Sequence, residues 1–458
     1  MKKSTAFFGI AILLISSVTA SAVGFKENFE MKGDGFIQSE FENLIDHFDP
    51  TDERTYSQRF WYNADGFDYE KGPIFLYICG EYVCGVNEER QFPVKVAQEF
   101  NGLFVYLEHR YYGESQPFPD SNDVADLGYL TAKHALADLA VFLSTLNNEL
   151  IKTHGGEKRK IVVVGGSYPG ALSAWFRAKY PHIAEASWAS SAVVQAVEDM
   201  TMFDYQIYNS TMRSSETCTK VIQDFTEYYD SLVESGDEST LNDIKSYFDA
   251  TDLDNALFAR TLVHFYVGKV QYGKRTQLCE FLENIADLPI LERFKKVADN
   301  YDENDYKYLD EVLRTENNGH ISTGDAWHYQ YCTEYGYFQT PYDGVSMRSK
   351  LLKLPYWQQG CRESFGDQII TEARETNVFF GSDMIRGSNT FYTNGGEDPW
   401  QWVGVTHVYD ELNQVSRLLQ CENCAHCVEL YNEREDDSDE LKQVRLEIKE
   451  WLKKIIYS

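Results

Sequence analysis

The chain has 458 residues, which is enough for one large domain or for a core that carries an insertion. Hydrophobic residues make up 43% and aromatic residues 15%, so there is ample apolar material for a packed core. The formal charge is −30, from 42 Lys and Arg against 72 Asp and Glu. Such an acidic surface repels phosphate backbones and anionic lipids, which excludes nucleic acid and membrane surfaces as expected partners.

The first 22 residues have the pattern of a secretory signal peptide. Lys2 and Lys3 precede the apolar stretch AFFGIAILLISSV, and Ala20-Ser21-Ala22 supplies the small residues of a cleavage site. An uncleaved membrane anchor is the alternative, but the apolar stretch is short for a bilayer span. We therefore expect cleavage after Ala22 and an exported chain without stable membrane insertion, either secreted or sent to a lysosome-like or vacuolar compartment.

Cysteines in an exported chain are expected to form mostly disulfides. The odd count leaves at least one thiol free or paired between molecules, and the spacing leaves the connectivity open. Asn209 opens the single N-x-S/T sequon, so one N-glycan is expected there if the host glycosylates. The nine cysteines are Cys79, Cys84, Cys218, Cys279, Cys332, Cys361, Cys421, Cys424 and Cys427.

Strand and helix patterns alternate in the first part of the mature chain, residues 23–200. Buried strands separated by helices predict a parallel sheet covered on both faces, and hence an α/β fold. The expected strands are PIFLYI (73–78), GLFVYL (102–107) and KIVVVGG (160–166), and the expected helix is LTAKHALADLAVFLSTLNNEL (130–150).

The character of the sequence changes after residue 200. Residues 201–370 show helical periodicity with few strand patterns, which predicts a helical insertion. Residues 371–458 return to the sheet, with strands expected at TNVFFGSDM (376–384) and NTFYTNGG (389–396). An amphipathic helix closes the chain, and its apolar stripe is interpreted as core packing.

The stretch IVVVGGSYPG (161–170) places a serine on a glycine-rich corner between a strand and a helix. This is the context of a nucleophile elbow, in which Ser167 would stand at the apex with its hydroxyl exposed. The usual G-x-S-x-G spacing fails at its last position, where Pro169 stands, although proline is tolerated in a first helical turn. A capping serine in an ordinary turn is the alternative, and a phosphate loop is disfavoured because no Lys-Ser/Thr follows.

Two later segments supply the partners that a nucleophilic serine needs. Asp398 follows the strand expected at 389–396, with Glu397 as a competitor, and His426 lies in CENCAHCVEL. The order serine, acid, histidine is that of α/β-hydrolases. The segment Cys421-x-x-Cys424-x-His-Cys427 has spacing that can also bind zinc, but disulfides are the preferred interpretation in an exported chain.

Taken together, these residues resemble the exported serine peptidase family that includes lysosomal Pro-Xaa carboxypeptidase, dipeptidyl peptidase II and thymus-specific serine protease. The resemblance implies an α/β-hydrolase core with a helical cap at 201–370. It also implies exopeptidase action on short peptides beside proline, with Ser167 as nucleophile, Asp398 as acid and His426 as base. The matching stretches are LIDHFDP (44–50), QRFWYN (58–63), GPIFLYICGE (72–81), EHRYYGES (108–115), LTAKHALADLA (130–140), GGSYPGALSAWFRAKYPH (165–182), YCTEYGYFQT (331–340), NGGEDPW (394–400) and AHCVEL (425–430).

Three departures from the family pattern bear on substrate choice and pH optimum. Relatives commonly have glycine at the position of Pro169, and a second histidine and an arginine where this chain has Cys427 and Tyr431. We expect the backbone N–H of Tyr168 to form half of the oxyanion hole, and that of Gly80 or Glu81 to form the other half. The mechanism requires no metal and no organic cofactor.

Several other residues have a functional and a structural interpretation. Glu81 or Glu334 would suit a substrate amine, but each serves equally as a structural ion-pair or hydrogen-bonding partner. Aromatic residues Tyr112, Trp327 and Tyr337 would suit a proline pocket, although aromatics are core by default. His109 is expected to orient a loop, and Arg110 to pair with a carboxylate.

The alternatives in function are an esterase or lipase of the same fold, and an inactive binding glycoprotein that kept the fold. The polar, acidic insertion does not suggest a lipase, and the intact serine, acid and histidine disfavour a binding protein. Whether the enzyme is a carboxypeptidase or a dipeptidyl peptidase is not fixed by these residues. The sequence also leaves a homodimer open.

Overall fold

A computed structural model describes residues 23–25, 31, 35–121, 123–301 and 323–458. The expected signal peptide, residues 1–22, lies outside the described residues. No helix in the described part of the chain has both the length and the apolar character to cross a bilayer.

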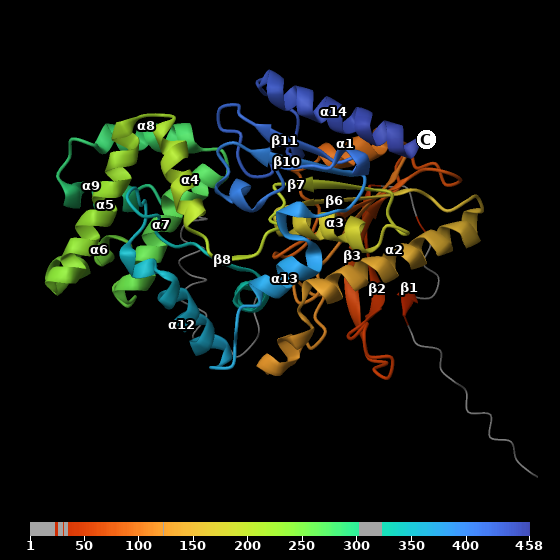
Figure 1. Cartoon of the computed structure of the whole chain (residues 1–458), viewed down its shortest axis with the longest axis horizontal. Coiled ribbons are helices and arrows are strands. Elements are labelled where there is room, and N and C mark those ends of the chain that lie inside the picture. The colour runs from red at the N-terminus through yellow and green to blue at the C-terminus, as the bar shows by residue number, and fades with distance from the viewer. Residues whose placement is uncertain (1–22, 26–30, 32–34, 122, 302–322) are drawn as a thin grey trace, which may run out of the picture.

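A single mixed sheet of nine strands, counted over the described residues, forms the centre of the molecule (Figure 1). The strand order is β1-β2-β3-β5-β4-β6-β7-β10-β11. The pairs β1–β2, β2–β3 and β3–β5 are antiparallel, and every later pair is parallel. The strands are β1 (Gly24–Phe25), β2 (Phe36–Leu44), β3 (Thr55–Asn63), β4 (Ile74–Ile78), β5 (Leu103–Leu107), β6 (Ile161–Gly166), β7 (Ala186–Ser190), β10 (Thr390–Gly395) and β11 (Val415–Leu419).

Strand residues alternate between the two faces of this sheet, as the period of two requires. Along β6, Val162 and Val164 join the core on one face, while Ile161 and Val163 join the core on the other. Helices α1 (Phe92–Glu99) and α14 (Asp439–Ile456) cover the first face, and α2 (Ala132–His154) and α3 (Tyr168–Lys179) cover the second (Figure 1). The expected α/β fold is confirmed, with both faces of the parallel region covered by helices.

Most of the helices after β7 lie away from the sheet. Helices α4 to α9 gather at one side of the molecule, and within this group α4 lies nearest to the sheet (Figure 1). A disulfide between Cys218 and Cys279 joins α5 to α8. The helices are α4 (Thr201–Met212), α5 (Glu216–Ser235), α6 (Glu238–Tyr247), α7 (Asn255–Gln271), α8 (Arg275–Ile285), α9 (Ile290–Ala298), α11 (Thr323–Gln330), α12 (Leu354–Phe365) and α13 (Ala373–Phe380). The helical character expected after residue 200 is present, while the domain boundaries at 200 and 370 stay a prediction.

Shorter elements connect these helices and strands. Strands β8 (Val197–Asp199) and β9 (Gly336–Phe338) form a parallel pair outside the main sheet. One π turn occupies Tyr331–Tyr335 in the described chain. The 3-10 turns there are Val124–Tyr129, Lys350–Leu352, Ser382–Met384, Pro399–Val403, Asp410–Leu412 and Val428–Leu430.

The strand expected at 376–384 is wrong, because helix α13 covers most of this stretch. Its buried residues Ala373, Thr376 and Phe380 are three and four positions apart, while Val378 remains 78% exposed. Phe380 stacks on Trp175 of α3 with ring centroids 4.2 Å apart. A short β-branched and aromatic run does not distinguish a strand from a helix by itself, and packing against α3 favours the helix here.

Candidate active site

The serine corner adopts the strained conformation that a nucleophile elbow requires. Ser167 follows β6 and precedes α3, with φ at 66° and ψ at −129°. A non-glycine residue rarely adopts positive φ unless its surroundings hold it there. The Ser167 N–H donates to the Ser190 carbonyl at 2.9 Å, which anchors the corner to β7. A Cβ at Gly165 would lie 2.1 Å from the Pro169 carbonyl oxygen, so the tight corner requires glycine.

The departure at Pro169 is accommodated by a glycine in the loop after strand β4. Pro169 lies in the first turn of α3, where its missing N–H breaks no helical hydrogen bond. Gly80, just beyond β4, faces this ring: a Cβ at Gly80 would lie 2.4 Å from Pro169 Cγ. The loop after β4 and the start of α3 are therefore in contact beside Ser167.

Asp398 and His426 are in direct contact. The Nδ1–H of His426 donates to Asp398 Oδ2 at 2.7 Å, and their side chains are 3% and 0% exposed. Burial by itself lowers the pKa of His426, but the Asp398 carboxylate raises it more, so the pKa lies above its ordinary value. Asp398 also accepts the Trp400 N–H at 2.9 Å, which fixes the carboxylate at the start of the following turn.

The loop that bears His426 is held by the sheet and by the helical insertion together. The His426 N–H donates to the carbonyl of Gln271, the last residue of α7, at 2.9 Å. The next N–H, that of Cys427, donates to Ser191 Oγ beyond β7, also at 2.9 Å. The position of the imidazole therefore depends on elements from two distant parts of the chain.

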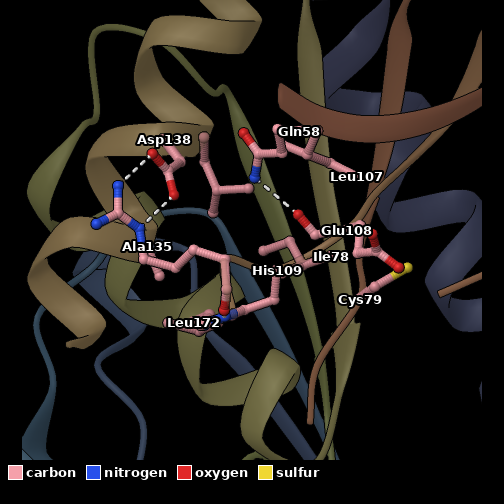
Figure 2. Close-up of a pocket in the computed structure, with 11 residues that line it drawn as sticks. Gln58, Ile78, Cys79, Leu107, Glu108, His109, Ala135, Asp138 and Leu172 are labelled. Atoms are coloured by element: carbon pink, nitrogen blue, oxygen red, sulfur yellow. Dashed lines mark hydrogen bonds and ion pairs between the residues drawn. The ribbon is translucent and has the colours of Figure 1, made fainter. Parts of the chain in front are cut away.

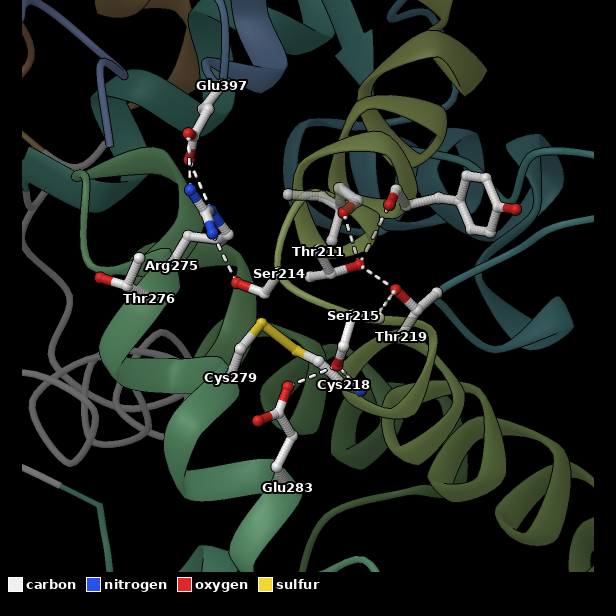
Figure 3. The surroundings of a disulfide bond; sticks show 12 residues. Thr211, Ser214, Ser215, Cys218, Thr219, Arg275, Thr276, Cys279, Glu283 and Glu397 are labelled. Atoms are coloured by element: carbon white, nitrogen blue, oxygen red, sulfur yellow. Dashed lines mark hydrogen bonds and ion pairs between the residues drawn. A yellow bond between two sulfur atoms is a disulfide. The ribbon is translucent and has the colours of Figure 1, made fainter. Parts of the chain in front are cut away.

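Glu397, the competitor of Asp398, points to a different partner. Arg275 of α8 donates to both of its carboxylate oxygens, at 2.9 Å each, and both side chains are buried (Figure 3). Glu397 also pairs with Arg213 at 3.2 Å and accepts the Asn423 N–H at 2.9 Å. The disulfide between α5 and α8 lies beside this cluster (Figure 3). Glu397 thus ties the turn that carries Asp398 to the insertion.

Ser167 and His426 line one cavity of about 250 Å³. Glu81, Trp327 and Tyr337 line it as well, and their roles toward a substrate end and a proline ring stay predictions. No hydrogen bond joins the Ser167 hydroxyl to the imidazole in the described structure. A hydrogen bond between them would require a rotation or small approach of these side chains, and such contacts are often long in structures without substrate.

Tyr112 and His109 do not line the cavity, but hydrogen bonds connect them to Tyr168, which does. The Tyr168 hydroxyl accepts the Gln330 amide at 2.9 Å and lies 3.0 Å from His109 Nε2. Tyr112 donates to Gln330 Oε1 at 2.5 Å and is fully buried, so it does not line the cavity. Burial lowers the pKa of His109 to about 4, and its neutral ring donates through Nδ1 to the Arg110 carbonyl at 2.7 Å. The expected orienting role of His109 is confirmed.

Arg110 belongs to a buried polar cluster that fixes the loop after β5 against α2. Its guanidinium pairs with Asp138 at 2.7 Å, as expected for a structural arginine. Gln58 of β3 donates to the Glu108 carbonyl at 2.7 Å (Figure 2). The cavity between them is only about 10 Å³, no more than a single water needs. This cluster is structural.

The two candidate carboxylates for a substrate amine occupy different surroundings. Glu334 does not line the cavity; it accepts the Ala132 N–H at 3.0 Å, near the start of α2, and the Tyr335 hydroxyl at 3.0 Å. Burial raises the pKa of Glu334 to about 7. Glu81 lines the cavity, burial raises its pKa, and its Oε2 has no hydrogen-bond partner in the described structure.

Sequence reasoning missed six further lining residues. Arg90 follows a loop without a recognisable motif, so no local pattern marked it. Gln271 and Tyr272 come from the end of α7, in the insertion, and only tertiary packing brings them to the sheet. The six are Tyr82, Arg90, Val193, Gln271, Tyr272 and Trp400.

The cysteines form four disulfides, as expected for most of them. Because Cys421 and Cys424 are bonded to each other, neither offers a thiolate to zinc, and the disulfide interpretation holds. Cys427 is the free thiol and is buried. Asn209 lies half-buried in α4, and its glycosylation stays a prediction. The bonds are Cys79–Cys84, Cys218–Cys279, Cys332–Cys361 and Cys421–Cys424.

Comparison with known proteins agrees with this geometry. Residues 43–448 match the family described as serine carboxypeptidase S28. The probable serine protease EDA2 of Arabidopsis thaliana is 34% identical over 406 residues, covering 84% of this chain and 79% of the relative. The thymus-specific serine protease of Mus musculus is 28% identical over 456 residues, covering 91% and 88%. The lysosomal Pro-X carboxypeptidase of the same species is 27% identical over 449 residues, covering 91% and 88%.

The matched region includes β6, β10 and the loop that carries His426. The family match therefore covers all three segments that contribute Ser167, Asp398 and His426. The chain belongs to the serine carboxypeptidase S28 family and is a serine-type peptidase with an α/β-hydrolase fold.

Proposed function

We propose that this protein is an exported serine exopeptidase that cleaves short peptides next to proline through Ser167, His426 and Asp398. The observation that carries the proposal is the 2.7 Å contact between His426 and Asp398 at the cavity that the Ser167 corner also lines. The three residues follow the parallel strands β6, β10 and β11, with β7 between β6 and β10, and the carboxyl ends of these strands lie at one edge of the sheet.

The reaction proceeds by acyl transfer. His426 Nε2 takes the hydroxyl proton as Ser167 Oγ bonds to the scissile carbonyl carbon, and the same proton passes to the leaving amine as the C–N bond breaks. Water then attacks the acyl carbon and gives a proton to His426 Nε2. As the ester C–O bond breaks, this proton passes to Ser167 Oγ, which releases the acid and restores the serine hydroxyl. Asp398 holds Nδ1–H and stabilises the imidazolium in both steps.

Oxyanion stabilisation is assigned to backbone N–H groups at the same edge. The N–H of Tyr168 follows the nucleophile, and the loop after β4 brings Gly80 and Glu81 against the first turn of α3. The loss of one such donor typically lowers turnover by ~10²–10³. The proposed chemistry draws on protein groups alone.

Proline selectivity is assigned to the aromatic wall. Trp327 packs on Tyr168 with centroids 5.5 Å apart, and Tyr337 lines the same cavity, which gives a flat apolar surface suited to a pyrrolidine ring. Gln271, Tyr272, Trp327 and Tyr337 belong to the proposed cap, residues 201–370, and line the cavity, which suits short peptides. Relatives named lysosomal or extracellular support export, with a signal peptide at 1–22 and a glycan at Asn209 as parts of the proposal.

A serine-directed fluorophosphonate tests the proposal. The folded protein is expected to be labelled, Ser167→Ala to lose labelling, and the exposed matched control Ser239→Ala to keep it. Labelling of Ser167→Ala would remove this serine from the mechanism, and an unlabelled wild type would favour an inactive binding glycoprotein. Hydrolysis of simple esters without hydrolysis of proline peptides would favour an esterase.

A further inference from the structure

Arg90 is a cation of the catalytic cavity, which it shares with the carboxyl group of Glu81. It lines the cavity with Ser167 and His426, yet in the described part of the chain it forms no ion pair with a carboxylate. The chain carries 72 Asp and Glu, so the absence of a partner is not a shortage of carboxylates. Most buried arginines of the described chain pair with an Asp or Glu: Arg59, Arg110, Arg275, Arg348 and Arg445. The other two, Arg159 and Arg177, donate to backbone carbonyls, and Arg177 also donates to the Ser388 hydroxyl; neither lines the cavity.

The position of Arg90 is fixed against the loop that bears the proposed base. Its Nη2 donates to the Tyr431 hydroxyl at 3.1 Å, and the guanidinium lies 4.8 Å from the centre of the Tyr431 ring. The Asn432 N–H donates to the Glu89 carbonyl at 2.8 Å, and the Gln91 N–H donates to Asn432 Oδ1 at 3.0 Å. These bonds clamp both neighbours of Arg90, so the guanidinium is held in place before any substrate binds.

This location corresponds to the leaving-group side of the reaction. The imidazole of His426 returns its proton to the leaving amine, so the residue being released lies beside His426 and its loop. In a C-terminal residue the carboxylate is only two bonds from that amine nitrogen, through one Cα. A fixed guanidinium next to this loop therefore lies where a free C-terminal carboxylate would be released.

We infer that Arg90 binds the C-terminal carboxylate of the substrate, so that the enzyme removes residues from the carboxyl end of peptides. This inference rests on the proposed peptidase function and names the chain end that the same site recognises. An arginine suits the task because its planar fork donates two parallel hydrogen bonds to a carboxylate and remains charged at every physiological pH.

The alternative is recognition of a substrate amine by Glu81, the carboxylate that lines the cavity. Burial raises the pKa of Glu81, so its side chain is more readily neutral than an exposed glutamate, and a neutral acid attracts an ammonium group weakly. The charge of Arg90 does not depend on pH in this way. The cavity therefore favours an anionic over a cationic chain end, most strongly in an acidic compartment.

The test compares three proline peptides of one sequence: N-blocked with a free carboxylate, N-blocked with a C-terminal amide, and C-blocked with a free amine. The wild type is expected to cleave the free acid with a kcat/KM at least 10-fold above that of the other two. In Arg90→Gln the ratio of acid to amide should fall about 10- to 100-fold, since a hydrogen bond to a charged group contributes roughly 1.5–3 kcal/mol. Arg90→Lys should restore part of it.

Fluorophosphonate labelling of Ser167 separates the outcomes. If Arg90→Gln is labelled, its active site is folded. If the wild type is not labelled, the proposed peptidase function itself is wrong. If the wild type is labelled but prefers the free-amine peptide, the assignment of Arg90 is wrong. It is also wrong if Arg90→Gln keeps the wild-type ratio of kcat/KM for the free acid to kcat/KM for the amide. The exposed Arg386→Gln, at the opposite end of β10, is the matched control and should leave the ratio at the wild-type value.

Discussion

The buried pair of Arg275 and Glu397 makes a quantitative prediction about how the insertion supports the catalytic edge. The perturbation is Arg275→Met, which keeps the length of the side chain and removes two charge-assisted hydrogen bonds of 2.9 Å to Glu397. Removing one partner of a buried ion pair typically costs about 3–5 kcal/mol. In this variant Glu397 still pairs with Arg213 at 3.2 Å and accepts the Asn423 N–H at 2.9 Å. We therefore expect a loss at the lower end of this range, about 3 kcal/mol in the free energy of unfolding.

A double-mutant cycle isolates the pair. Glu397→Gln should cost a similar amount, because it leaves the buried guanidinium of Arg275 with only the exposed carboxylate of Glu422, 3.6 Å away. The double variant should cost clearly less than the sum of the single variants, since neither charge is then left unpaired. Because the next residue is Asp398, kcat is also expected to fall by about 10- to 100-fold in each single variant.

The measurements are equilibrium urea unfolding by tryptophan fluorescence and steady-state cleavage of a proline peptide. Arg417→Met serves as the matched control, because its ion pair with Glu447 is exposed and should cost no more than about 1 kcal/mol. The pair does not couple the insertion to the turn that carries Asp398 if Arg275→Met destabilises the protein no more than this control does. The same conclusion follows if the losses in free energy of unfolding of the two single variants sum to that of the double variant.

Three further predictions concern the cavity and its surroundings. Asp398→Asn should lower kcat by about 10⁴-fold with little change in KM, because the amide no longer fixes the imidazole tautomer; an unchanged kcat would remove Asp398 from the proposed triad. Gly80→Ala places a Cβ 2.4 Å from Pro169 Cγ and should slow fluorophosphonate labelling by about 10²-fold, and a rate near that of the wild type would contradict the close contact. Burial raises the pKa of Glu334 to about 7, so the stability of the wild type relative to Glu334→Gln should be greatest below the ordinary glutamate pKa and decline as pH rises through 7. Urea midpoints between pH 5 and 8 measure this difference, and a relative stability that rises with pH would be the contrary result.

The sequence by itself determined the parts of the fold that short windows encode. The run of β-branched residues before two glycines predicted strand β6, and the serine that follows occupies the strained turn expected of it. Apolar residues three and four apart predicted helices α2 and α14. Each of these depends on steric and hydrogen-bonding preferences within one turn or strand, which do not change when the rest of the chain is altered.

Local pattern was insufficient where two structures fit the same residues. The stretch at 376–384 is rich in β-branched and aromatic residues, yet α13 forms there because Phe380 stacks on Trp175. Glu397 and Asp398 are adjacent and chemically alike, so their order in sequence could not assign them. The structure separates them: Asp398 contacts His426, and Glu397 contacts Arg275.

Only the tertiary structure decided which distant groups share the cavity. Arg90 is held against Tyr431, and the last residue of α7, Gln271, holds the backbone of His426. The spacing of these residues in the sequence has no period that a strand or a helix could explain. Their contacts exist because the parallel strands bring their carboxyl ends to one edge and the helical insertion packs against that edge, a result of packing the whole chain.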